Sequence, residues 1–199
     1  MQQFDENLIK SKPLLLKYQQ ILLEWQKKVN LISNSTINDI WQRHIMDSAQ
    51  LYPLIPSKAK ILLDVGSGAG FPGIVLAILN KTLNGPLKQV FLVESDLKKS
   101  LFLQEVNRQL GLNVEVLPKR MESVDIAPDV ITARAVAAVP ELLKLVDKNV
   151  SRETLMLFLK GKNVDKELQN IPKCYMIQKK QSLLSADGCV LMIRKGKHG

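Results

Sequence analysis

Short apolar runs alternate with helix-like stretches between residues 60 and 170, and this alternation constrains the fold more than any other feature. The runs are rich in leucine and β-branched residues, as expected of strands that are buried on both faces. They cover residues 60–65, 90–94, 114–117, 130–133 and 155–159, and the helices predicted between them cover 73–82, 97–110, 138–148 and 163–170. The pattern predicts a mostly parallel sheet with helices on both faces, which is the α/β fold class.

Two further apolar runs lie near the C-terminus, at residues 175–177 and 190–193. The link between them is rich in turn-forming residues, among them Ser182, Asp187 and Gly188. Because nothing in this link reads as a crossover helix, the two runs should pair as an antiparallel hairpin on the edge of the sheet.

Residues 1–56 follow a helical pattern instead. The apolar residues Leu14, Tyr18, Leu22 and Trp25 recur at the spacing of one helix face, and a second stripe follows over residues 37–48. Thr36 with Asp39 resembles a capping box at the start of this second helix. We therefore expect an N-terminal helical cap at residues 1–56, followed by one α/β domain at residues 57–199.

The charge of the chain is unevenly distributed. Its 28 lysines and arginines exceed its 19 acidic residues by nine, and 46% of its 199 residues are hydrophobic, which is enough for an ordinary core. Residues 61–150 are neutral, whereas residues 1–60 carry an excess of three positive charges and residues 151–199 an excess of six. A nucleic acid is therefore one candidate partner, and the basic segment 194–198 could contact phosphates, although many basic proteins have no such partner.

The sequence predicts neither a membrane segment nor a metal site. The longest apolar stretch, residues 74–79, is far shorter than the roughly 18 residues of a membrane span, and Asp5 and Glu6 lie where a signal peptide would be basic. The two cysteines, Cys174 and Cys189, form no motif typical of a zinc site or a disulfide framework. We expect a cytoplasmic protein, monomeric, that binds no membrane and no metal.

The most informative motif follows the first predicted strand and reads Asp64-Val-Gly66-Ser-Gly68-Ala-Gly70-Phe71-Pro-Gly73. Its glycines allow positive φ angles and leave no Cβ in the way, so backbone N–H groups can approach an anionic ligand at the start of the next helix. The last three glycines also read G-x-G-x-x-G, and Glu94 follows at about the distance, roughly 20 residues, at which dinucleotide-binding proteins have an acidic residue. The glycines alone do not decide whether the loop binds a nicotinamide dinucleotide, binds another cofactor, or is a tight turn without a ligand.

The position of Asp64 distinguishes between these possibilities. The pattern D-x-G-x-G-x-G resembles the first motif of S-adenosylmethionine-dependent methyltransferases, in which the loop receives the methionine portion of the cofactor. In those enzymes an acidic residue at the end of the second strand accepts hydrogen bonds from both ribose hydroxyls. The resemblance favours a methyl donor over nicotinamide and implies that Asp64, Gly66, Gly68 and Glu94 bind S-adenosylmethionine.

Seven short motifs occur in a specific order along nearly the whole chain. They are Trp25-Gln-Lys-Lys-Val-Asn-Leu31, His44-Ile-Met-Asp47-Ser48, the glycine loop, Lys98-Lys-Ser-Leu-Phe-Leu103, Lys119-Arg120-Met121-Glu122, Thr132-Ala-Arg134-Ala135 and Leu159-Lys160-Gly161. In this order and spacing they resemble the bacterial family of small-subunit (16S) ribosomal RNA guanine-N7 methyltransferases, known as RsmG or GidB. Gln26 is a departure, because the family usually has Asn after this Trp.

The resemblance implies a Rossmann-like class I methyltransferase fold, with S-adenosylmethionine as cofactor and 16S ribosomal RNA or the small ribosomal subunit as partner. It also implies cofactor contacts at Gly66, Phe71, Met121, Glu122 and Arg134, with Met121 and Glu122 beside the adenine. Glu122 could instead serve only as the first residue of a helix.

Guanine N7 carries a free lone pair, so its methylation needs no general base and depends chiefly on alignment with the methyl group. The candidate catalytic residues are three cations at predicted strand ends, Arg120, Arg134 and Lys160. Arg134 could pair with the cofactor carboxylate or guide the RNA, and the other two could contact phosphate or the O6 edge of guanine.

These cations also have simpler explanations. Arg134 could form an ion pair with Asp129 or Asp147, and the other two could be solvated surface charges. His44 and Asp47, one helical turn apart, are expected to be structural, with His44 bonded to Asp47 or to the backbone.

The sequence thus predicts an enzyme that transfers a methyl group from S-adenosylmethionine to N7 of a specific guanine in 16S ribosomal RNA. A methyltransferase with another substrate is one alternative. The others are a nicotinamide-dinucleotide-binding protein and a non-catalytic RNA-binding module that has kept the glycine loop.

Overall fold

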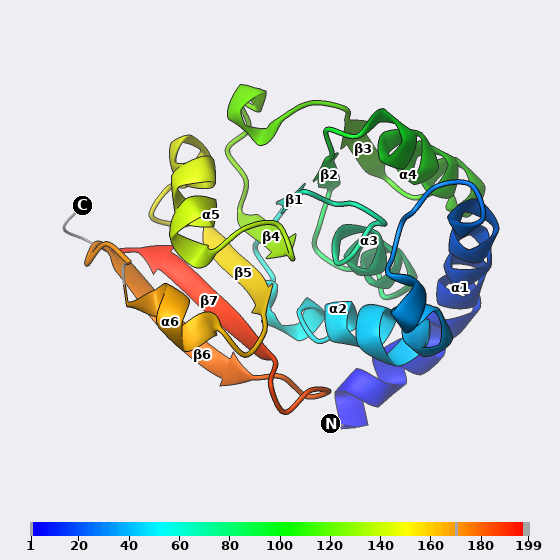
Figure 1. Ribbon diagram of the computed structural model, residues 1–199, viewed down its shortest axis with the longest axis horizontal. Helices are drawn as coiled ribbons and strands as arrows, with labels where there is room; N and C mark the ends of the chain where they lie inside the picture. Colours follow the sequence, from blue (N-terminus) through cyan, green and yellow to red (C-terminus); the bar gives the residue numbers. More distant parts are fainter. Residues whose placement is uncertain (1, 170, 197–199) are drawn as a thin grey trace.

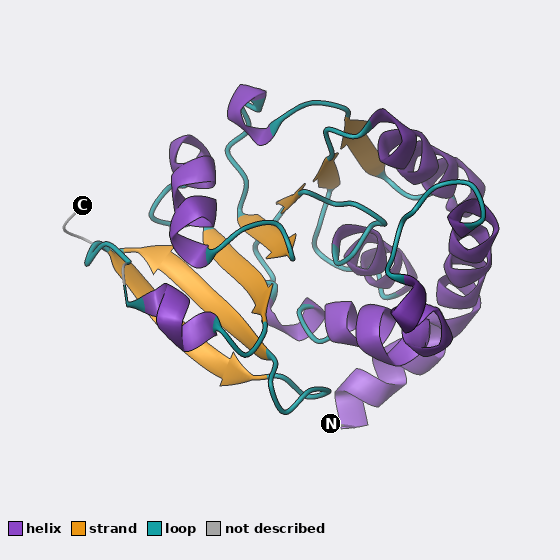
Figure 2. Cartoon of the chain, in the orientation of Figure 1, coloured by secondary structure: helices purple, strands orange, loops and turns teal. Residues whose placement is uncertain are grey.

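The computed structural model describes residues 2–169 and 171–196, which are built around one twisted sheet with helices on both faces (Figures 1 and 2). The sheet order is β3-β2-β1-β4-β5-β7-β6. The strands are β1 (Ile61–Val65), β2 (Gln89–Val93), β3 (Val114–Leu117), β4 (Val130–Arg134), β5 (Leu155–Lys160), β6 (Tyr175–Gln181) and β7 (Cys189–Lys195). Strands β1 to β5 pair in parallel, and β7 is antiparallel to both β5 and β6. The parallel sheet with an antiparallel C-terminal hairpin is therefore confirmed.

The helices predicted between the strands are present. They are α3 (Gly73–Thr82), α4 (Leu97–Leu110), α5 (Val139–Val146) and α6 (Val164–Leu168). The ends of α4 have local causes, because Asp96 accepts a hydrogen bond from the Lys99 N–H at 3.0 Å and Gly111 adopts the left-handed conformation after the last turn. No helix in residues 2–169 and 171–196 is long and apolar enough to cross a membrane.

Alternate residues of the strands face two hydrophobic cores. Leu62 packs into the core that contains α1, α3 and α4, whereas its neighbour Leu63 packs into the core that contains α5, and both side chains are fully buried. Because successive side chains of a strand point to opposite faces, this sheet can be stable only when helices cover both of them.

The first helix, α1 (Gln2–Gln26), is longer than the apolar stripe suggested and contains Pro13. Leu15, Tyr18 and Leu22 are fully buried in the same core as α3 and α4, so the core is continuous across the expected boundary at residue 56, which itself stays a prediction. After the helix ends, the side-chain oxygen of Gln26 accepts hydrogen bonds from the backbone N–H groups of residues 31 and 32.

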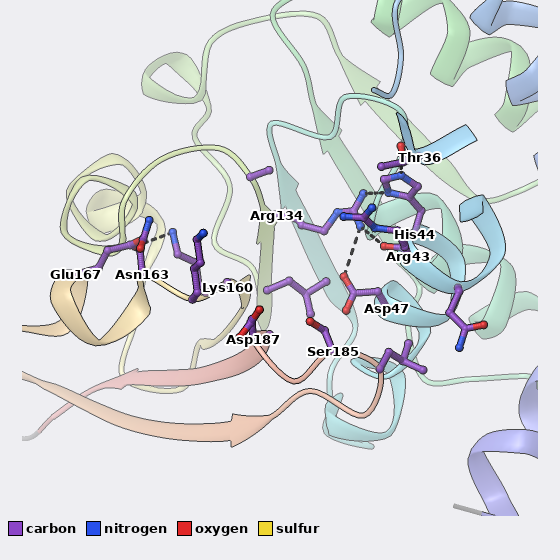
Figure 3. A pocket seen from close by; sticks show the side chains of 17 residues that line it. Thr36, Arg43, His44, Asp47, Arg134, Lys160, Asn163, Glu167, Ser185 and Asp187 are labelled. Carbon is purple, nitrogen blue, oxygen red and sulfur yellow. Dashed lines mark hydrogen bonds and ion pairs between the residues drawn. The ribbon is translucent and has the colours of Figure 1, made fainter. Parts of the chain in front are cut away.

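The second N-terminal element differs from the predicted α-helix. It consists of a 3-10 segment (Asn34–Asp39), a π-helical segment (Trp41–Met46) and the short α2 (Asp47–Ala49). The predicted capping box is wrong, because the Thr36 hydroxyl donates to the Ser33 carbonyl at 2.8 Å and is bonded to His44 instead. The wider π-helical turn presents His44 and Asp47 toward the end of β4 (Figure 3).

Candidate active site

The glycine-rich loop joins the C-terminal end of β1 to α3, at the edge of the sheet where the parallel strands end. Gly66, Gly68 and Gly70 have φ angles of 61°, 56° and 91°, so the predicted positive φ angles are confirmed. A Cβ on Gly66 would lie 2.7 Å from Cγ2 of Val136, whereas the nearest atom to a Cβ on Gly68 would be 3.8 Å away. The backbone at Gly68 is therefore open toward a possible ligand.

Asp64 lies beneath this loop. Its side chain is fully buried, and one of its oxygens accepts a hydrogen bond from the Thr132 hydroxyl at 2.6 Å. Burial raises the pKa of Asp64 to about 6, and the hydrogen bonds that it accepts oppose this shift. The carboxyl group thus ties β1 to β4 under the loop, and it would serve a cofactor by supporting the loop.

Glu94, which directly follows β2, lies beside the loop. Its almost buried carboxylate accepts hydrogen bonds from the N–H of Gly68 and the N–H of Asp96, both at 2.8 Å. A carboxylate oxygen can accept more than one hydrogen bond, so Glu94 retains capacity for hydroxyl groups of a ligand. The structure thus brings together the glycine loop and Glu94, which the sequence predicted as parts of one cofactor site.

The segment after β3 carries Met121 and Glu122 in a short 3-10 turn. Because β3 neighbours β2, this turn lies at the same edge of the sheet as Glu94. Met121 is buried, whereas Glu122 and Arg120 are exposed. Within the described part of the chain, the side chain of Arg120 forms no ion pair, which leaves this cation available to an anionic partner.

Arg134, the last residue of β4, is surrounded by the N-terminal cap (Figure 3). Its guanidinium donates to the Arg43 carbonyl at 3.0 Å, to the Asp47 carboxylate at 3.4 Å and to Nδ1 of His44 at 2.5 Å. It also lies 5.0 Å from the ring centre of the buried Phe71, on which the His44 ring stacks at 5.0 Å. The cap thus fixes the orientation of Arg134 and of the loop residue Phe71 together.

These partners differ from the expected ones. Arg134 pairs with Asp47 and not with Asp129 or Asp147. The His44 ring is bonded to Arg134 and Thr36 and not to the Asp47 side chain, while the His44 carbonyl accepts the N–H of Asp47. Asp129 directly precedes β4 and therefore lies at the opposite end of the strand from Arg134. The motif that contains His44 and Asp47 was the signal in the sequence for the pairing of Asp47 with Arg134. It could not show that the partner lies 87 residues away along the chain.

The His44 ring is neutral at physiological pH. Burial, together with the positive charges of Arg134 and Arg43, lowers the pKa of His44 to about 4. Since Arg134 can only donate, Nδ1 must be the acceptor and Nε2 carries the hydrogen, which it donates to the Thr36 hydroxyl at 2.9 Å. Nδ1 thus holds the arginine, and Nε2 anchors the ring to Thr36.

Lys160, at the end of β5, is a paired cation. Its ammonium forms a 2.7 Å ion pair with Glu167 and donates to the Ala137 carbonyl at 2.7 Å, and its side chain is only 10% exposed. Glu167 in turn accepts the N–H of Val139 at 2.8 Å. Lys160 and Glu167 therefore connect the loop after β4 to α6, and a contact between Lys160 and phosphate would require this pair to open.

A cavity of about 770 Å³ lies between the cap, the ends of β4 and β5, and the hairpin turn at residues 182–188 (Figure 3). Arg134 and Lys160 line it, together with polar residues that sequence reasoning missed, namely Gln42, Arg43, Lys162, Asn163 and Ser185. In sequence these residues look like ordinary surface positions. In residues 2–169 and 171–196, no group of three or more His, Cys, Asp or Glu side chains could hold a metal ion.

Comparison with known proteins supports the expected relationship. A family model described as rRNA small subunit methyltransferase G (GidB) matches residues 11–191. The protein named ribosomal RNA small subunit methyltransferase G of Jannaschia sp. (strain CCS1) is 40% identical over 184 residues, which cover 91% of this chain and 86% of that protein.

Solved structures share the fold at low sequence identity. The ribosomal protein L11 methylase from Lactobacillus delbrueckii subsp. bulgaricus has a TM-score of 0.62 at 16% identity, covering 77% of this chain and 79% of its own. A mutant of MtNAS in complex with S-adenosylmethionine has a TM-score of 0.58 at 13% identity, covering 96% of this chain and 77% of its own. These likenesses confirm the Rossmann-like methyltransferase fold, and the family model and the relative together show that the chain belongs to the rRNA small subunit methyltransferase G family.

Proposed function

We propose that this protein transfers a methyl group from S-adenosylmethionine to N7 of a guanine in 16S ribosomal RNA. The observation that carries the proposal is the hydrogen bond between the Glu94 carboxylate and the N–H of Gly68. It joins the acidic residue after β2 to the open glycine of the loop after β1, at the edge where open α/β sheets bind their ligands. The names of the family and of the Jannaschia relative support ribosomal RNA as the substrate.

The residues at this edge fit S-adenosylmethionine. The N–H of Gly66 would hold the carboxylate of its methionine portion, while the N–H of Gly68 stays bonded to Glu94. Glu94 would also accept hydrogen bonds from the ribose hydroxyls. Met121 and Glu122 would lie beside the adenine. When bound, the cofactor supplies a methyl group on a positively charged sulfonium.

The strand order favours this cofactor over a nicotinamide dinucleotide. The usual dinucleotide-binding sheet has the order 3-2-1-4-5-6. In this chain the antiparallel β7 lies between β5 and β6. The glycine pattern alone did not separate the two cofactors, and the topology of the C-terminal strands adds the missing distinction.

The chemistry requires alignment and no proton transfer. A bound S-adenosylmethionine would supply the methyl group to the free lone pair of N7, so no residue of this chain would need to remove a proton. Correct alignment of reacting atoms can contribute roughly 7 to 11 kcal/mol. His44 is not free to act as a base, because both of its nitrogens are hydrogen-bonded and its pKa is about 4. Arg134 would contribute by orienting cofactor or RNA at the end of β4.

A ribosomal RNA substrate implies that the protein acts in the cytoplasm. The proposed reaction uses the protein as a monomer. Sedimentation of the purified protein would test the monomer, and a concentration-dependent increase in mass would contradict it.

Two measurements test the proposed function. Calorimetry with S-adenosylmethionine and with NAD should give binding of the first only, and binding of NAD alone would exclude a methyltransferase. Labelled methyl transfer to small ribosomal subunits that lack the modification, followed by nuclease digestion and mass spectrometry, should give N7-methylguanine. A label at any other atom would contradict the mechanism.

The role of Arg120 can be tested in the same assays. The variant Arg120→Ala should retain cofactor binding and lose transfer, because the exposed cation would contact RNA. An equal loss of both would assign Arg120 to the cofactor site.

A further inference from the structure

The cavity between cap and hairpin lies on one particular side of the cofactor loop. In the sheet, β2 and β3 flank β1 on one side, and β4 and β5 follow on the other. Glu94 and Met121 belong to the first side, which the adenosine portion of the cofactor would occupy. The cavity adjoins Arg134 and Lys160, at the ends of β4 and β5, and therefore remains available to the second substrate.

The charges around the cavity are suited to a nucleotide. Two of its cations are neutralised, Arg134 by Asp47 and Lys160 by Glu167. Two others, Arg43 in the cap and Lys162 after β5, are exposed and form no ion pair within the described residues. Unpaired cations on different walls of one cavity can contact different phosphate groups of one strand.

The remaining lining suits the base of a nucleotide. The amides of Gln42 and Asn163 can both donate and accept hydrogen bonds, and the carboxylate of Asp187 can accept them from ring N–H and amino groups. The volume of about 770 Å³ lies within the usual range of roughly 300 to 1,000 Å³ for small-ligand sites, so a nucleotide can enter.

One buried residue links the two walls of the cavity. The side-chain amide nitrogen of Gln50, in the cap, donates to the Asp47 carboxylate at 2.7 Å and to the Ser182 hydroxyl at 3.2 Å. Its oxygen accepts the N–H of Leu183 at 3.0 Å, across 133 residues of sequence. Gln50 is only 6% exposed, and it connects the hairpin turn to the carboxylate that pairs with Arg134.

We propose that this cavity binds a nucleotide of the RNA substrate, with Arg43 and Lys162 contacting the phosphate groups of the nucleotide. Gln50 is then a positioning residue, which holds the hairpin turn in place as one wall of the cavity. The inference rests on the proposed function and adds to it the location of the RNA. Among the described residues, the side chains of Arg43, Gln50 and Lys162 form no hydrogen bond with the glycine loop, so Arg43→Ala and Lys162→Ala should affect RNA binding and not cofactor binding.

The phosphate contacts are tested with Arg43→Ala and Lys162→Ala. Each variant should weaken binding of 16S ribosomal RNA by at least about tenfold, as expected for the loss of one charged hydrogen bond. Each should also lower the slope of log affinity against log salt by about 0.7 to 0.9, and affinity for S-adenosylmethionine should stay unchanged. Lys144→Ala, which removes an exposed lysine of α5 that does not line the cavity, is the matched control.

The positioning role is tested with Gln50→Met, which preserves approximate volume and removes every hydrogen bond of the amide. Its KM for small subunits should rise several-fold, whereas kcat should fall by a smaller factor, because the lost hydrogen bond to Asp47 also loosens the support of Arg134. Ser182→Ala removes one of the two hydrogen bonds that join Gln50 to the hairpin turn and leaves the bond to Asp47 intact, so it should raise KM to a smaller extent and provides the test if Gln50→Met fails to fold.

The outcomes separate this inference from the proposed function. If the original protein methylates RNA but Arg43→Ala and Lys162→Ala bind RNA as well as Lys144→Ala does, the cavity is not the RNA site. Equal losses of cofactor and RNA binding would also overturn the inference, because the cavity would then belong to the cofactor site. If the original protein transfers no methyl group to RNA, the proposed function itself fails.

Discussion

Replacing Gly66 with alanine should destabilise the protein more than the same replacement at Gly68, although the two residues have similar backbones. Their φ angles are 61° and 56°, and an L-residue in this left-handed conformation costs roughly 1 to 2 kcal/mol. At Gly66 the new Cβ would also lie 2.7 Å from Cγ2 of Val136, and overpacking of this kind typically costs about 1 to 3 kcal/mol. The free energy of unfolding should fall by about 2 to 5 kcal/mol for Gly66→Ala and by about 1 to 2 kcal/mol for Gly68→Ala.

Urea unfolding followed by circular dichroism measures both changes. Titration calorimetry with S-adenosylmethionine should show the larger loss of cofactor affinity for Gly68→Ala. The methyl group of this variant enters the open space beside the loop, where the proposed ligand lies. We therefore expect Gly68→Ala to remain folded and to lose cofactor affinity.

The double variant Gly66→Ala with Val136→Ala measures how much of the destabilisation by Gly66→Ala comes from the contact with Val136. It removes the two γ-carbons that crowd the new Cβ, so about 1 to 3 kcal/mol of the destabilisation should be recovered relative to the sum of the single variants. Equal destabilisation by Gly66→Ala and Gly68→Ala, or additivity of the double variant, would refute this account of the loop.

Three further predictions concern buried polar groups. Burial raises the pKa of Asp64 from its ordinary value of 3.8 to about 6, so the native state binds the proton more tightly than the unfolded state does. The protein should therefore gain up to about 3 kcal/mol of stability relative to Asp64→Asn as the pH falls from 6 to 4. Parallel pH profiles of the two proteins in urea unfolding would contradict this. The pKa of His44 is lowered from 6.5 to about 4, so its contribution has the opposite sign. After a discount for the partly exposed ring, the protein should lose up to about 2 kcal/mol relative to His44→Gln as the pH falls from 6.5 to 4. An unchanged difference between the two proteins would argue against a neutral ring. For the Lys160–Glu167 pair, a double-mutant cycle with Lys160→Met and Glu167→Gln should give a coupling energy of about 1 to 3 kcal/mol in thermal unfolding, and a value near zero would mean that the pair does not hold the loop after β4.

The sequence alone was sufficient for features that depend on neighbouring residues. The limits of α4, the strand Val114–Leu117 and the positive φ angles of the glycine loop follow from periodicity, capping and the missing Cβ, all of which act within a few residues. The hairpin was predictable for the same reason, because its turn-rich link is short. Family motifs then identified the loop as part of a methyltransferase.

Only the tertiary structure decided which side chains meet. The pairing of Arg134 with Asp47 spans 87 residues, and that of Gln50 with Leu183 spans 133. Both depend on how the cap packs against the sheet and on the π-helical turn before Asp47, which a regular apolar stripe did not predict. Periodicity says which face of a helix is buried, but the choice of partner for a buried charge depends on which groups the folded chain brings within hydrogen-bonding distance.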